Sequence, residues 1–187
     1  DGSDPIDAIM SGQILSSAGN LAKTGTGTLA LKTTSLYTGT TTVSAGTLML
    51  GDGTGNTGNL STTSSIAVST GATLAVNRTG AVTQATDFNG KIISGAGSFL
   101  QAGSGTTTLS LVNTYAGATT VSAGTLTLGA TGSIGTSANC AVAPSEATGA
   151  KAGSGRWDSA KNSRPFRSAQ RSPSDRNRPA SFSAVMP

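Results

Sequence analysis

The sequence predicts an all-β fold: a parallel β-helix, or β-solenoid, of about six or seven coils over residues 1–143, followed by a disordered basic tail over residues 144–187. Three observations predict the solenoid. One pattern occurs twice at a fixed distance, short runs of apolar residues alternate with period two, and glycine-rich turns separate those runs. A fixed period in a short chain is typical of repeat proteins, in which each unit buries its apolar face on its neighbours.

The repeat relates residues 12–51 to residues 90–129, a shift of 78 positions. Without gaps, 21 of the 40 positions carry the same residue, and the longest shared block, TTVSAGTL, begins at Thr41 and again at Thr119. In a stack of coils, we expect equivalent positions to form columns with the same environment. The apolar pairs expected to match are Leu31 with Leu109, Val43 with Val121, Leu48 with Leu126 and Leu50 with Leu128.

Short alternating runs supply the candidate strands. Each run places apolar residues at every second position, and therefore on one face of a strand. Threonine suits such strands because its branched Cβ fits a pleated surface. An antiparallel sandwich would also fit short strands, but the regular repetition favours a solenoid of about 20 residues per coil. The candidate strands are 28–31, 47–50, 66–68, 73–76, 109–111 and 126–128.

The composition excludes several kinds of chemistry. Charged residues make up 11% of the chain, well below the roughly 25% of an average domain. There is no histidine, the usual proton carrier near neutral pH and the commonest metal ligand. Cys140 is the single cysteine, so an internal disulfide is impossible. No apolar run is long enough for a transmembrane helix. We therefore predict no catalytic, cofactor-binding or metal site.

The basic tail differs from the rest of the chain. Residues 1–143 carry four basic and five acidic side chains, whereas residues 144–187 carry eight basic and three acidic ones. Five of the six prolines also lie in the tail. We expect disorder there, because so few apolar groups cannot offset the entropy of ordering the segment.

Two interpretations of the tail compete. Its arginines could contact a nucleic acid or another acidic surface. In the second interpretation, which we favour, the tail has no evolved role, and no nucleic acid is expected as a partner. The repeat breaks off after Val142, which suggests the hypothesis of a shifted reading frame. The arginines of the tail are Arg156, Arg164, Arg167, Arg171, Arg176 and Arg178.

The first residues, DGSDP, contain neither an initiating Met nor an apolar signal core. This predicts that the chain is an internal or processed piece.

Candidate catalytic residues are few. Asp52 and Asp87 are the only acidic residues between positions 9 and 142, and they lie at non-equivalent points of the repeat. Hydrolysis needs a pair of carboxylates or a nucleophile with its base. Ser44 and Ser122 have no histidine partner, so we interpret them as turn or strand hydroxyls. Cys140 is expected to be a small buried side chain in an interrupted coil.

Two further patterns bear on binding. Tyr37 and Tyr115 occupy equivalent positions and could stack on sugar rings, but equal positions in a repeat favour a structural role at a corner. Thr-x-Thr steps begin at Thr24, Thr38 and Thr106, and flat threonine rows resemble those of ice-binding solenoids. Because these steps fall in irregular registers, we do not favour ice binding.

The repeated signature resembles the passenger-associated transport repeat, also called the autotransporter-associated β-strand repeat. It runs from Gly25 to Gly51 and from Gly103 to Gly129, with Tyr37 at the characteristic tyrosine position of the first copy. The resemblance covers about residues 9–142. It implies a right-handed parallel β-helix that belongs to the passenger of a bacterial type V secretion system.

The resemblance also implies a function. The expected role is a non-enzymatic stalk and secretion-folding segment at the cell surface, or in a secreted form, of a Gram-negative bacterium. Adhesion to a host or matrix surface and a part in virulence are further implications, and the parent's outer-membrane barrel would lie outside this chain. Uncapped strand edges also predict edge-to-edge self-association. The alternative is a fragment of a polysaccharide-acting β-helix protein, with the ice-binding solenoid as a third.

Overall fold

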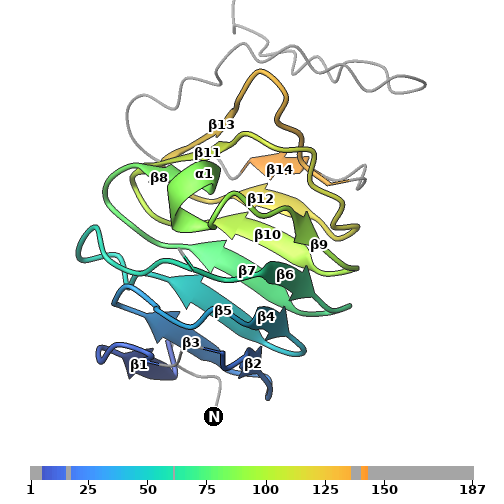
Figure 1. The fold of residues 1–187 in the computed structure, drawn as a ribbon. Coiled ribbons are helices and arrows are strands. Elements are labelled where there is room, and N and C mark those ends of the chain that lie inside the picture. Colours follow the sequence, from blue (N-terminus) through green and yellow to red (C-terminus); the bar gives the residue numbers. More distant parts are fainter. Residues whose placement is uncertain (1–5, 16–17, 61, 136–139, 143–187) are drawn as a thin grey trace, which may run out of the picture. The chain divides into compact units, whose positions relative to one another are not determined.

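The strands of this protein stack as the coils of a solenoid. The computed structural model describes residues 6–15, 18–60, 62–135 and 140–142. They form a parallel β-solenoid of about six turns, which confirms the predicted fold class (Figure 1). The tail predicted over residues 144–187 lies outside the described residues.

A seven-stranded sheet runs through the whole stack. Each strand between β1 and β14 pairs in parallel with a strand of the coil before it and a strand of the coil after it (Figure 1). Its strands, in stacking order, are β1 (Ala8–Met10), β3 (Thr28–Leu31), β5 (Thr47–Leu50), β7 (Thr73–Val76), β10 (Ser98–Gln101), β12 (Thr119–Val121) and β14 (Cys140–Val142).

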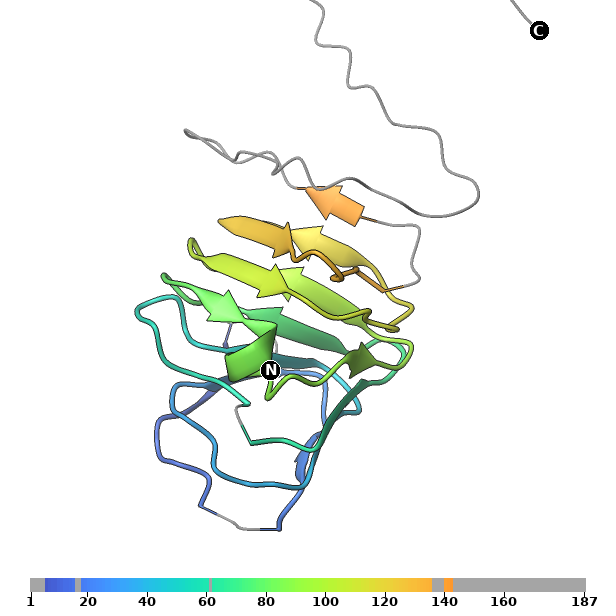
Figure 2. The ribbon, with the colours of Figure 1, turned by 45° about the horizontal axis from the view of Figure 1, so that its top comes forward.

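Two smaller sheets form parts of the other sides. The four-stranded sheet belongs to the earlier coils and contains β2 (Leu21–Lys23), β4 (Thr40–Val43), β6 (Ser65–Val68) and β9 (Ile93–Ser94). The three-stranded sheet belongs to the later coils and contains β8 (Val82–Thr83), β11 (Thr106–Leu109) and β13 (Thr125–Leu128). Figure 2, turned from the first view, shows the strands of successive coils lying one above another.

Inward-facing side chains of successive coils form continuous apolar rows. Leu48 lies beside Leu74, which lies beside Phe99, and all three are fully buried. A neighbouring row continues from Leu31 through Leu50. Such rows explain why leucine recurs in the candidate strands, because burying a leucine side chain stabilises a fold by about 1.5–3 kcal/mol.

Most of the predicted strands are confirmed, but the one expected over residues 109–111 is wrong. The strand β11 ends at Leu109. The amides of Ser110 and Leu111 instead donate to Oε1 of Gln84, each over 3.0 Å. These amides therefore bond to a side chain in place of a neighbouring strand. The sequence also did not predict the short helix α1 (Gln84–Asp87), which follows β8 directly.

The expectation that the two repeat copies share columns is also wrong. Thr28–Leu31 of the first copy lies in the seven-stranded sheet, whereas its equivalent, Thr106–Leu109, lies in the three-stranded sheet. Likewise Thr40–Val43 lies in the four-stranded sheet, and Thr119–Val121 in the seven-stranded sheet. The shift of 78 residues thus equals three turns of the solenoid plus one further side.

The segment between the copies explains this displacement. Residues 52–89 contain a long connection before β6 and the helix α1 after β8, so the coils here are longer. In the seven-stranded sheet, Thr47 pairs with Thr73, 26 residues on, whereas Thr28 pairs with Thr47, only 19 residues on. Each repeat copy therefore spans two coils and contributes two strands to each, one on either side of a corner. The first copy lies at the corner between the four- and seven-stranded sheets, and the second at the corner between the seven- and three-stranded sheets.

Glycines let these corners stack closely. Gly46 has a φ of 62°, and its equivalent Gly124 has a φ of 65°. A Cβ at Gly46 would overlap the carbonyl oxygens of Gly25 and Gly27 in the coil before it, and a Cβ at Gly124 would overlap those of the corresponding turn. Glycine is required at these corners by both backbone conformation and space.

We expect Gly46→Ala and Gly124→Ala to destabilise the fold more than Gly71→Ala. Gly71 has a φ of 77° but open space around its Cβ position, so this variant carries only the conformational cost, about 1 kcal/mol. Gly55→Ala is the neutral control, because its Cβ meets nothing within 4 Å and its φ is not positive. Urea unfolding measures the order; equal losses for Gly46→Ala and Gly71→Ala would contradict the close stacking.

Candidate functional site

The first candidate carboxylate, Asp52, forms a surface ion pair. It lies in the turn after β5, where its Oδ2 is 2.6 Å from Nζ of Lys32. The hydroxyl and the amide of Thr54 donate to its Oδ1 over 2.6 Å and 3.0 Å. The bonds from Lys32 and then from Thr54 lower the pKa of Asp52 well below its usual range. This is the turn environment that the sequence predicted.

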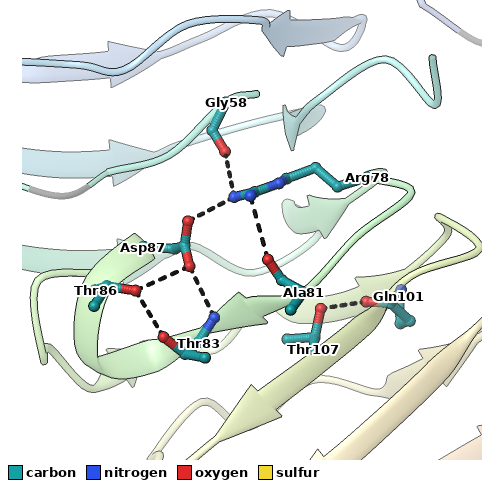
Figure 3. A network of polar contacts seen from close by, with 8 residues as sticks. All are labelled: Gly58, Arg78, Ala81, Thr83, Thr86, Asp87, Gln101 and Thr107. Carbon is teal, nitrogen blue, oxygen red and sulfur yellow. Dashed lines mark hydrogen bonds and ion pairs between the residues drawn. The ribbon is translucent and has the colours of Figure 1, made fainter. Parts of the chain in front are cut away.

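The second carboxylate, Asp87, is held in a largely buried ion pair at the end of α1 (Figure 3). Its Oδ1 is 2.5 Å from Nη1 of Arg78, and its Oδ2 accepts a bond of 2.8 Å from the amide of Thr83. The guanidinium also donates to the carbonyl oxygens of Gly58 and Ala81. Arg78 thereby joins Gly58 in the coil before it to Ala81 ahead of β8 and to Asp87 at the end of α1.

The two carboxylates are held in separate ion pairs. Each is bonded to its own cation, Asp52 to Lys32 and Asp87 to Arg78. Within the part of the chain that the structure describes, no group of three or more His, Cys, Asp or Glu side chains could hold a metal ion. The described ion pairs fasten turns and coils to one another.

Ser44 and Ser122 lie at equivalent turns after β4 and β12. The amide of Ser44 donates 2.8 Å to the carbonyl oxygen of Lys23, and the amide of Ser122 donates 2.8 Å to that of Gln101. The Ser122 hydroxyl donates to the same Gln101 carbonyl. The two serines therefore stand in turns that join neighbouring coils, as the sequence predicted.

A polar clamp at each repeat corner escaped the sequence analysis. The buried ammonium of Lys23 donates to the carbonyl oxygens of Thr24 and Gly25, both over 2.8 Å. At the equivalent position, the buried amide of Gln101 donates to the carbonyl oxygens of Gly103 and Gly105. Both side chains thus bond to carbonyl oxygens of the adjacent turn, and that of Gly105 also accepts the amide of Thr125 over 3.0 Å.

The two repeat copies also differ at the position that bonds to the Gln101 side chain, and the difference has a chemical reason. Gln101 also has an acceptor, Oε1, and Thr107 donates to it over 2.6 Å (Figure 3). The lysine ammonium has only donors. The residue equivalent to Thr107 is Leu29. The pairs Lys23 with Leu29 and Gln101 with Thr107 were invisible in the sequence because only the fold shows that positions 23 and 101 point inward.

Buried amides support the irregular side of the later coils. Gln84 is fully buried and donates from Nε2 to Oδ1 of Asn113 over 2.7 Å. Asn113 accepts the amide of Ile93 over 2.8 Å and donates to the carbonyl oxygen of Ser133 over 2.8 Å. These side chains satisfy backbone groups where no strand does so.

Both tyrosines are structural, as their equal positions predicted. Tyr37 and Tyr115 are 1% and 0% exposed, so neither can stack on a sugar ring. The hydroxyl of Tyr37 shares a hydrogen bond of 2.5 Å with Thr41, and that of Tyr115 one of 2.6 Å with Thr119. Each tyrosine therefore anchors its corner to the strand that begins the shared TTVSAGTL block.

The expectation that Cys140 is buried is wrong. Cys140 is exposed, because β14 is the last described strand and no described coil covers it. Although the side chain is exposed, partial desolvation still raises the pKa of its thiol. A raised pKa lowers the thiolate fraction at neutral pH, which argues against a reactive cysteine.

The threonine steps align in only one place. On the three-stranded sheet, Thr106 and Thr108 lie beside Thr125 and Thr127, which is more regular than the sequence indicated. On the other side of β11, the strand β8 adds a single threonine, Thr83, which lies beside Thr108. Among the described residues, this array has two full rungs, too few for an extended flat face.

The buried tyrosines predict a loss of stability at high pH. Burial raises the pKa of Tyr37 and of Tyr115, so their contribution is complete below the unfolded value of about 10 and is lost as the pH rises through the folded values. We expect the free energy of unfolding of the wild type to fall more steeply between pH 8 and pH 11 than that of Tyr37→Phe/Tyr115→Phe. Urea titrations at both pH values measure this; parallel declines would contradict the prediction.

The double variant is the reference for the contribution of all groups other than the two tyrosines. It contains no tyrosine, because the chain has only these two, and it keeps every other ionisable side chain of the wild type. At pH 8 it should already be less stable, by about 1 kcal/mol for each lost hydrogen bond.

Comparison with known proteins identifies the repeat. A family model described as the passenger-associated transport repeat matches residues 21–50 and 99–128. No curated protein and no solved structure matches the chain. No helix in the described part of the chain is long and apolar enough to span a membrane. The matched segments contain the glycine corners and the buried tyrosines, so the chain carries two copies of the passenger-associated transport repeat.

Proposed function

We propose that this chain is a non-enzymatic structural segment of an autotransporter passenger, which acts as a stalk at the surface of a Gram-negative bacterium and assists its own export by folding coil by coil. The matched repeat family, whose members occur in autotransporter passengers, supports the location. The stacked corners support the mechanism, because each coil contacts the coils directly before and after it.

Neighbour-only pairing is the single observation that carries the folding role. Every strand of the seven-stranded sheet pairs with the strands one coil away, and the smaller sheets follow the same rule. In such a stack, stability is approximately a sum of coil terms and neighbour terms, so folding can spread from one nucleus along the axis. A segment that emerges through a membrane gradually can therefore fold gradually.

The same features support the absence of catalysis. The described carboxylates are bonded to Lys32 and Arg78, and the chain has no histidine to activate a serine. The described surface shows no feature that favours the polysaccharide-acting alternative. Adhesion and a part in virulence have no described residue to carry them, so we leave both out of the proposal.

Export through a surrogate transporter tests this function. The full chain is placed between the signal peptide and the outer-membrane barrel of an unrelated autotransporter, and display is measured by the access of an external protease. We expect Gly46→Ala/Gly124→Ala to reduce the displayed fraction several-fold, because weak corners slow folding outside the cell. Gly55→Ala is the matched control and should be displayed like the wild type.

The comparison also has a clear negative result. If the corner variant folds less stably in solution but is displayed as well as the wild type, then coil stacking does not drive export. The proposal would likewise fail if the wild type were retained inside the cell, since the repeat would then give no help to secretion.

A further inference from the structure

The seven-stranded sheet has an unpaired edge at each end. At one end, β1 pairs only with β3, and at the other, β14 pairs only with β12, among the described strands. Both edges belong to the same sheet, and every pairing between them is parallel. The free edge of β14 in one copy could therefore pair with the free edge of β1 in another and continue the same sheet.

The apolar core is also open at both ends. Its central rows are fully buried, whereas its partly buried members come from the first coils and the last one. Val142 on β14, which continues the inward row of Leu31 and Leu50 beyond Val121, is 64% exposed. The partly buried members are Met10, Ile14, Leu21 and Leu29 at the first end, and Leu126, Leu128 and Ile134 at the last.

Within their described residues, the two edge strands lack the usual protection against strand pairing. Natural edge strands are commonly guarded by lysine, proline or inward-pointing charges. The strand β1 reads AIM and β14 reads CAV, with no charge and no proline in either. Asp7, next to β1, accepts the amide of Thr28 and so bonds toward the second coil.

We propose that copies of this chain stack head to tail, with β14 of one copy pairing in parallel with β1 of the next. The same rows would then continue from chain to chain. Cys140 follows Thr119 in the inward row, and Ala8 precedes Leu29 in that row, so Cys140 of one copy would lie beside Ala8 of the next. Because this contact joins two different surfaces, it leaves a free edge at each end and can propagate into filaments. The inference does not depend on the proposed function.

A pair of edge variants tests the stacking. In the full chain, Ile9→Lys blocks the β1 edge and Ala141→Lys blocks the β14 edge, each by placing a charge at the new contact. Sedimentation velocity should show wild-type masses that grow with protein concentration, and each variant should remain a monomer. A mixture of the two variants should form dimers and stop there, because one intact β14 edge meets one intact β1 edge.

The control variant separates edge blocking from charge. Thr42→Lys adds the same charge on the outer face of β4, which lies between β2 and β6, and it should associate like the wild type. A wild type that stays monomeric at every concentration would overturn the proposal. So would association by Ile9→Lys alone, which would indicate pairing of two β14 edges, or a monomeric Thr42→Lys.

Disulfide trapping checks the register without charge changes. Ala8→Cys should form cross-linked multimers through the native Cys140 under mild oxidation, because paired residues on adjacent strands lie within disulfide reach. Ile9→Cys is the matched control, since its side chain points to the opposite face of β1. Equal cross-linking of the two variants, or of the wild type, would contradict the predicted register.

Discussion

The close stacking of one corner on the next is the constraint on which this structure depends. Gly46 lies against the turn formed by Gly25 and Gly27, and Gly124 lies against the turn formed by Gly103 and Gly105. A side chain at either position would hold the coils apart and break the pairing of the strands that follow. Once the corners fit, the inward rows align and the leucines of successive coils become buried. The shared TTVSAGTL block of the repeat contains this corner, which explains why it is the most strictly repeated part.

Around each corner, the polar groups are arranged to satisfy a backbone that has left its strand. Lys23 and Gln101 bond to turn carbonyls, whereas Tyr37 and Tyr115 bond to Thr41 and Thr119 in the next strands. Lys23, Tyr37 and Tyr115 thus act as structural clamps at the corners.

The sequence predicted the class of fold and most of the apolar strands, because period-two alternation and a fixed repeat report directly on a stacked sheet. It did not predict which side of the solenoid each copy would occupy. That displacement depends on how many residues the irregular sides contain, and no local pattern in residues 52–89 reports it. Cys140 was misjudged for a similar reason: its row points inward, but its burial depends on a covering coil. The clamps at positions 23 and 101 were missed because lysine and glutamine usually indicate a solvated surface.

The second repeat copy is displaced from the first by one side of the solenoid, and cysteine pairs test this displacement most directly. In a Cys140→Ser background, Thr73→Cys/Ser98→Cys should form an intramolecular disulfide, because residues 73 and 98 are partners on adjacent strands β7 and β10. Ser65→Cys/Ser98→Cys should not, because β6 and β10 belong to different sheets. If the second pair formed the disulfide and the first did not, the second copy would lie over the same corner as the first, and the displacement described here would be contradicted.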